Sequence, residues 1–152
     1  MSKYAILLFL LISAGLAGSA WSQESNRYIG SARCGECHDE QHEFFTRDSK
    51  KAHSWNSIER MKSNLKPNEL KECYTCHTTG YGQPGGFVSY ESTPEMADVG
   101  CETCHGPGER HAESLDTADI KRTPTIKDCE HCHSKERIHD FQFKPLRFSG
   151  AH

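Results

Sequence analysis

The sequence predicts a mainly α-helical chain with long loops, and three observations carry this expectation. The five-residue pattern Cys-x-x-Cys-His occurs four times in 152 residues. Between these copies, some segments place apolar residues at helical spacing, whereas others gather Gly and Pro. Hydrophobic residues make up 35% of the chain and charged residues 26%, so the side chains alone offer only a thin core.

The repeated pattern is the attachment signature of a c-type haem. Two thiols form thioethers with the haem vinyl groups, and the adjacent histidine binds the iron as its proximal ligand. A single Cys-x-x-Cys also fits zinc, a disulfide or a redox pair. All eight cysteines, however, fall in the four copies, which favours four covalently bound c-type haems. The attachment cysteines are Cys34, Cys37, Cys73, Cys76, Cys101, Cys104, Cys129 and Cys132, and the proximal histidines are His38, His77, His105 and His133.

The first 22 residues read as a secretory signal peptide. Lys3 supplies the positive end, residues 5–17 are apolar, and small residues follow at 18–20. Because c-type haem is attached outside the bacterial cytoplasmic membrane, this segment predicts a periplasmic or extracellular protein. Membrane association would follow only if the signal segment were retained as an anchor.

Residues 23–152 then form one domain, a tetrahaem cytochrome c. These 130 residues offer about 32 residues for each haem, so the apolar macrocycles must supply the centre of a compact multihaem fold. Without Lys3 the mature chain has 17 basic and 21 acidic residues, a net charge of −4 with neutral histidine. This balance argues against a nucleic-acid partner.

Helices are expected on both sides of the second motif. Residues 39–63 place aromatic and aliphatic side chains three to four apart, with a break expected near Asp48 and Ser49. Pro67 suits the first turn of a new helix that leads into Cys73. Residues 78–94, rich in Gly and Pro, predict an ordered, turn-rich loop with room for one small hairpin. A further helix is expected over residues 109–115.

Six of the ten histidines are not proximal, and four irons each have one further axial position. His53, His111 and His152 are the better candidates, because their sequence distances let the chain fold back over another ring. His42 follows its motif by four residues and His131 lies inside its own, so neither is expected to bind iron. His139 is a weaker candidate in the tail. A methionine ligand would raise the reduction potential, and Met61 and Met96 are available for that role.

Several segments outside the haem motifs resemble the cytochrome c-554 family of periplasmic tetrahaem electron carriers. The similar segments are Gly30-Ser-Ala-Arg-Cys-Gly-Glu-Cys-His38, Ala52-His53, Gly80-Tyr-Gly-Gln-Pro-Gly-Gly86, Val99-Gly-Cys-Glu-Thr-Cys-His-Gly-Pro-Gly108 and Asp140-Phe-Gln-Phe143 through His152. The resemblance implies a mainly helical fold with long loops. It also implies that His111 is distal to the first haem, His53 to the third and His152 to the fourth, and that the second haem has no distal ligand from the protein.

The function expected from motifs and resemblance together is electron relay between redox partner proteins through closely packed haems. One alternative is reduction of a small N-oxide such as nitric oxide at an open second haem. Another is a subunit of an extracellular cytochrome filament, or a smaller homo-oligomer, in which a terminal His152 completes a neighbour's haem. The chain is more readily a carrier than an enzyme, since it leaves little protein for a substrate pocket.

Overall fold

A computed structural model describes residues 25–134, and all structural statements refer to these residues. The expected signal segment and the candidate tail ligands His139 and His152 lie outside this range. The helices, in chain order, are α2 (Ser31–Gly35), α3 (Asp39–Asp48), η1 (Lys50–His53), α4 (Trp55–Met61), η2 (Lys62–Asn64), α5 (Pro67–His77), η3 (Pro94–Met96), α6 (Cys101–His105), α7 (Glu109–Ser114), η4 (Thr117–Asp119) and α8 (Ile126–Glu130). No strand occurs within residues 25–134, so the mainly helical prediction is confirmed.

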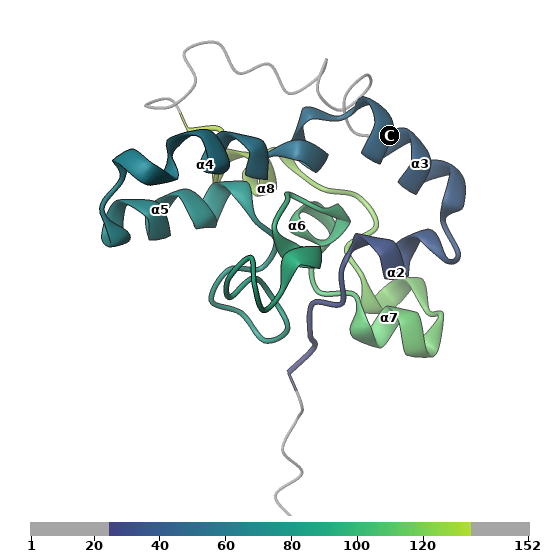
Figure 1. Cartoon of the computed structure of the whole chain (residues 1–152). Coiled ribbons are helices and arrows are strands. Elements are labelled where there is room, and N and C mark those ends of the chain that lie inside the picture. Colours follow the sequence, from purple (N-terminus) through teal and green to yellow (C-terminus); the bar gives the residue numbers. More distant parts are fainter. Residues whose placement is uncertain (1–24, 135–152) are drawn as a thin grey trace, which may run out of the picture.

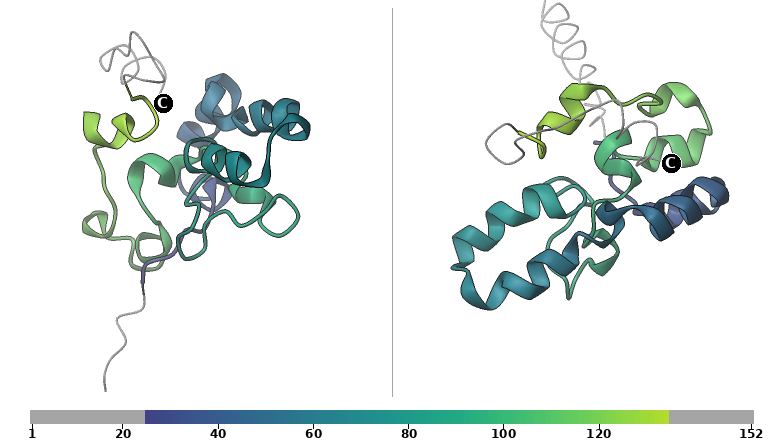
Figure 2. Two further views of the ribbon diagram at one scale, coloured as in Figure 1. Left: turned by 90° about the vertical axis from the view of Figure 1, so that its left-hand side faces the viewer. Right: turned by 90° about the horizontal axis from the view of Figure 1, so that it is seen from above.

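The short helices are arranged around α6, which lies near the middle of the described part (Figure 1). Helices α4 and α5 run side by side as a hairpin to one side of α6, whereas α2, α3 and α7 lie to the other side. The view from above in Figure 2 keeps the same separation. The third Cys-x-x-Cys-His copy, which is α6 itself, is therefore central.

The helix boundaries follow the sequence signals. Helix α3 ends at Asp48, and Ser49 turns to an extended conformation where the break is predicted. The Ser49 hydroxyl then accepts the backbone N–H of Lys51 and starts η1. Helix α5 begins at Pro67, and the Glu69 carboxylate accepts the N–H of Lys66 at 2.8 Å. Both predicted boundaries are confirmed, because each depends on local capping groups.

The apolar core of the described residues is small. It centres on Phe87, Met96 and Ala97, which are each at most 2% exposed. Half-buried aromatic side chains pack against this centre: Tyr28, Trp55, Tyr74 and Tyr81. Phe87 and Met96 both lie in the long connection between α5 and α6 and supply much of the buried volume, which explains why this connection is ordered.

The glycine-rich loop has no hairpin, since residues 78–94 contain no strand. It is held instead by backbone hydrogen bonds from Phe87 N–H to the Thr79 carbonyl and from Thr79 N–H to the Met96 carbonyl, both 2.9 Å. Gly80, at φ 65°, lies so close to the Tyr28 ring that a Cβ would come within 2.8 Å of it. The lack of a Cβ at Gly80 therefore lets the loop pack directly against Tyr28.

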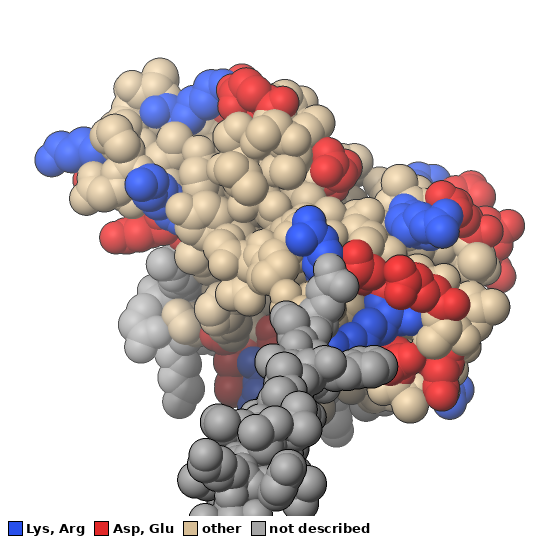
Figure 3. All heavy atoms as spheres, turned by 90° about the horizontal axis from the view of Figure 1, so that it is seen from below, with Lys and Arg blue, Asp and Glu red and all other residues tan. Residues whose placement is uncertain are grey.

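The surface carries both signs of charge. On the face seen from below, Lys and Arg side chains alternate with Asp and Glu side chains around a broad uncharged area (Figure 3). Within residues 25–134, no helix combines the length and the hydrophobicity that crossing a bilayer requires.

Candidate haem-attachment sites

Each Cys-x-x-Cys-His copy coincides with a helical turn. The second copy forms the last turn of α5, the third is α6, and the first and fourth lie at the ends of α2 and α8. In the first and fourth copies the histidine N–H donates to the carbonyl of the first cysteine, at 2.9 Å in both. A helical turn puts positions i, i+3 and i+4 on one face. Both thiols and the histidine of a copy can therefore meet one macrocycle edge.

The fold brings the first and third copies together. The Cys34 thiol lies within hydrogen-bonding reach of the Cys101 sulfur. This contact, together with burial, raises the pKa of Cys34. The same contact lowers the pKa of Cys101 to about 5, although burial acts in the opposite direction. These values describe free thiols, since a thioether sulfur carries no proton. The Ser31 hydroxyl also accepts the Cys101 N–H at 3.0 Å, which fixes the start of α6 against α2.

The other two copies also border α6. Thr103, inside the third copy, lies 3.3 Å from the hydroxyl of Thr79, two residues after the second copy. Burial raises the pKa of Cys104, and the nearby charge of Cys129 in the fourth copy raises it further. Groups attached to the four copies would thus share one neighbourhood, with the third copy bordering each of the others.

Backbone carbonyls hold the ring orientation of three histidines. The Nδ1 atoms of His77, His105 and His111 lie 3.2, 2.7 and 2.9 Å from the carbonyl oxygens of Ser54, Lys121 and Asp116. A carbonyl only accepts, so each Nδ1 carries a proton. In the neutral ring, Nε2 then keeps its lone pair for a metal, and such a carbonyl contact is the usual outer support of a ligating histidine.

A strained turn places the carbonyl that holds His111. Leu115 ends α7 with φ 60°, in the left-handed region, and its N–H donates to the His111 carbonyl at 2.8 Å. For a leucine this conformation costs about 1 kcal/mol. The turn carries the chain back so that Asp116 reaches His111.

The ring centroids of His38 and His111 lie 6.3 Å apart, and the two ring planes are 19° apart. A metal–nitrogen bond of about 2 Å, with the ring centre about 1 Å beyond that nitrogen, would put two axial imidazoles about 6 Å apart. The spacing of His38 and His111 therefore fits two ligands on opposite sides of one iron. The resemblance implies this same pair for the first haem.

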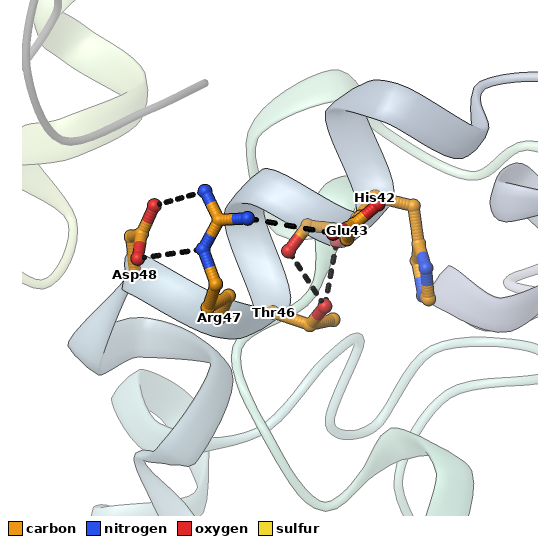
Figure 4. Close-up of polar contacts among 5 residues, drawn as sticks. All are labelled: His42, Glu43, Thr46, Arg47 and Asp48. Carbon is orange, nitrogen blue, oxygen red and sulfur yellow. Dashed lines mark hydrogen bonds and ion pairs between the residues drawn. The ribbon is translucent and has the colours of Figure 1, made fainter.

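The remaining candidates are placed differently. The His42 ring on α3 points away from the Thr46 and Arg47 side chains, whereas the His42 backbone carbonyl accepts the Thr46 hydroxyl at 2.7 Å (Figure 4). Its ring lies against Gly35, where a Cβ would come within 2.8 Å. His53 in η1 and His131 are both exposed. Met96 is buried in the apolar core, and Met61 is half exposed on α4.

Sequence reasoning missed the role of Glu102. This carboxylate, only 1% exposed, accepts backbone N–H groups of Ile29, Gly30 and Gly108 at 2.7 to 3.1 Å. Burial raises its pKa, against the opposing effect of those three donors. Glu102 thus ties the N-terminal segment and the Gly106-Pro-Gly108 turn to the third copy. Its position inside a haem motif gave no signal, since the x residues of that motif are unrestricted.

Within the described part of the chain, the cysteine and histidine side chains form no ready-made site for a bare metal ion. All eight cysteines lie in this part, and none of them forms a disulfide. Within residues 25–134, no three His, Cys, Asp or Glu side chains are grouped as metal ligands. The donor sets instead suit a haem, with two thiols and one imidazole per helical turn.

Comparison with known proteins agrees with the interpretation of these motifs as haem-attachment sites. Residues 33–106, which include three of the four copies, match the family described as cytochrome c554 and c-prime. Cytochrome c-554 of Nitrosomonas europaea is 33% identical over 92 residues, which cover 53% of this chain and 39% of that relative's length. The solved structure of reduced cytochrome c554 from the same organism has the same fold, with a TM-score of 0.60 at 22% identity over 82% of this chain and 83% of that one. Over residues 33–106, slightly less than half of its length, this chain is therefore similar to the cytochrome c554 and c-prime family, and it shares the fold of cytochrome c554.

Proposed function

We propose that this protein is an exported tetrahaem cytochrome c that relays electrons between redox partner proteins. The observation that carries the proposal is the central position of α6, whose residues border the segments of the other three copies. Haems attached at the four copies would be close neighbours, and electron exchange is rapid only between close neighbours. A relay needs such a continuous series.

The chain's own residues would hold each iron in a fixed coordination. Haem iron, when bound, supplies the change between the ferric and ferrous states. His38 and His111 would complete the first site, and the Asp116 carbonyl would keep His111 in the tautomer that leaves Nε2 available. By family resemblance His53 would serve the third haem and His152 the fourth, leaving the second without a distal side chain. Two imidazole ligands on one iron limit the structural rearrangement between its ferric and ferrous states. This favours electron transfer over conversion of a substrate at the iron.

Mass spectrometry of the mature protein should show four covalent haems and no disulfide, and a reductive titration should reversibly reduce all four. Fewer than four haems, with free thiols remaining, would overturn the proposal. Stopped-flow mixing of the reduced protein with nitric oxide tests the alternative activity. Reversible binding at one haem fits a carrier with an open second site. Repeated, electron-balanced consumption of nitric oxide would instead show an enzyme.

A further inference from the structure

A row of redox-active aromatic side chains runs from the second motif to the protein surface. Tyr74 occupies the first x position of that motif, between Cys73 and Cys76. Its ring lies 6.1 Å from the Trp55 ring, with the planes 18° apart. Trp55 in turn lies 5.0 Å from Tyr90, with the planes 17° apart. Tyr90 is 50% exposed, so the row ends at solvent.

Packing and hydrogen bonding hold the row in place. The backbone N–H of Trp55 donates to the Asp98 carboxylate at 2.8 Å, which fixes the start of α4. Phe87, 1% exposed, packs against both Trp55 and Tyr74, at 5.5 and 5.0 Å between ring centroids. Tyr81 also contacts Tyr74, at 5.3 Å. Packing alone would be satisfied by phenylalanine or leucine, and Phe87 is such a residue. The three rings that lead outward all have an oxidisable indole or phenol.

We propose that Tyr74, Trp55 and Tyr90 form a one-electron relay between the second haem and solvent, which lets the protein discharge an oxidising equivalent at its surface. The inference rests on the proposed function, because it requires a haem on Cys73 and Cys76. Electron tunnelling weakens steeply with distance, and the two ring contacts divide the path into short steps. Tyr90 can release its phenolic proton directly to water because it is half exposed.

Hydrogen peroxide is the oxidant that the relay would reduce, by supplying electrons from its aromatic side chains. Peroxide and two protons take two electrons and give two waters. In the ferric protein Tyr90 and Trp55 would each lose one electron and one proton, which leaves a neutral tyrosyl and a neutral indolyl radical. Hydrogen peroxide thus receives the two electrons and the two protons that Tyr90 and Trp55 lose, and it forms two waters. The iron ends in its starting ferric state. Two exposed tyrosyl radicals from different molecules can couple into dityrosine.

The test treats the ferric, four-haem protein with hydrogen peroxide. Electron paramagnetic resonance of freeze-quenched samples would detect the radicals, and peptide mapping would locate dityrosine and oxidised residues. The wild type should show Tyr90 oxidation. Trp55→Phe keeps an aromatic ring but removes the middle step, so Tyr90 oxidation should be lost, and Trp55→Tyr should restore it. Tyr81→Phe is the matched control: it removes one phenol from the same cluster, off the path, and should leave Tyr90 oxidation unchanged.

Two results would overturn the inference. One is Tyr90 oxidation in the Trp55→Phe protein to the same extent as in the wild type, which would show that the electron path does not pass through Trp55. The other is the absence of tyrosyl and indolyl radicals in a wild-type protein that carries all four haems, which would leave the proposed electron-carrier function standing. A missing second haem, seen by mass spectrometry, would overturn the proposed function as well. Haem content and optical spectra of each variant establish that it has folded.

Discussion

A single carbonyl oxygen determines what His111 can do. The Asp116 carbonyl accepts the Nδ1 proton at 2.9 Å, so the opposite nitrogen is the basic one. The ring lies 6.3 Å from that of the proximal His38. His42 is nearer to the motif in sequence, yet its ring is packed against Gly35. The distinction between these two histidines rests on orientation rather than on residue type.

Replacing His111 should therefore change one haem. In His111→Ala, one low-spin ferric haem should become high-spin or bind water, because the iron loses a strong-field nitrogen ligand. Electron paramagnetic resonance and optical spectroscopy of the purified oxidised protein would count the spin states. The matched control, His42→Ala, should leave that count unchanged. A spin change in the control, with none in His111→Ala, would refute the pairing of His38 with His111.

Glu102 shows how a single buried carboxylate can join distant segments. Glu102→Gln should lower the free energy of unfolding by about 2 kcal/mol, because an amide nitrogen would replace one of the two acceptor oxygens and face a backbone donor. Denaturant unfolding of the holoprotein would measure the loss. Glu113→Gln, on the exposed side of α7, makes the same chemical change and should have almost no effect. Equal stabilities of the two variants would show that the three N–H contacts contribute little.

The helices are too short to be stable by themselves, so their end groups matter. Helix α8 has five residues and delivers Cys129. The Asp128 carboxylate accepts the N–H and hydroxyl of Thr125, at 2.8 and 2.9 Å, and pairs with Lys121. These contacts lower the pKa of Asp128 to about 2. The hydrogen bond with Lys121 has the largest effect, and the Thr125 donors have the next largest. The charged form is thus favoured in the folded chain.

This capping arrangement predicts a pH dependence. The pKa of Asp128 is lower in the folded chain than in an unfolded chain, where it is about 3.9. The ionised carboxylate therefore stabilises the folded state fully above about pH 4, and this stabilisation is lost as the pH falls toward 2. Asp128→Asn should cost about 1 kcal/mol at neutral pH. Thermal unfolding at pH 7 and near pH 3 should show the difference from wild type shrinking. Glu130→Gln, on the same helix, is the control and should show no such trend. A difference independent of pH would exclude the charge as its cause.

At the scale of the whole molecule, the polypeptide has few apolar contacts of its own. Phe87, Met96 and Ala97 form the centre of the buried cluster, and the other three motifs lie around the third one, α6. Bound haems would add apolar surface to this arrangement. We therefore expect folding and haem attachment to be coupled, as they are in other small proteins whose cofactor supplies the core.

The sequence by itself determined the local features of the protein. The expected haem-attachment positions follow from a covalent spacing. The breaks at Ser49 and Pro67 follow from capping and proline geometry, so a few neighbouring residues suffice to predict them. The mainly helical class and the family were predicted on the same basis. The spare histidines could be ranked, but their ring orientations could not be derived.

Only the tertiary structure decided which segments meet. Three contacts join residues that are far apart in the chain. They are the contact between the thiols of Cys34 and Cys101, the ring contact of Tyr90 with Trp55, and the hydrogen bond from the Ile29 N–H to Glu102. Such contacts depend on how the loops direct the helices, and turn-rich segments give little information about direction. The glycine-rich loop illustrates this: its composition predicted an ordered, turn-rich segment, but only the fold shows that Gly80 meets the Tyr28 ring. Contacts of this kind arise from the packing of the whole chain, which no local pattern encodes.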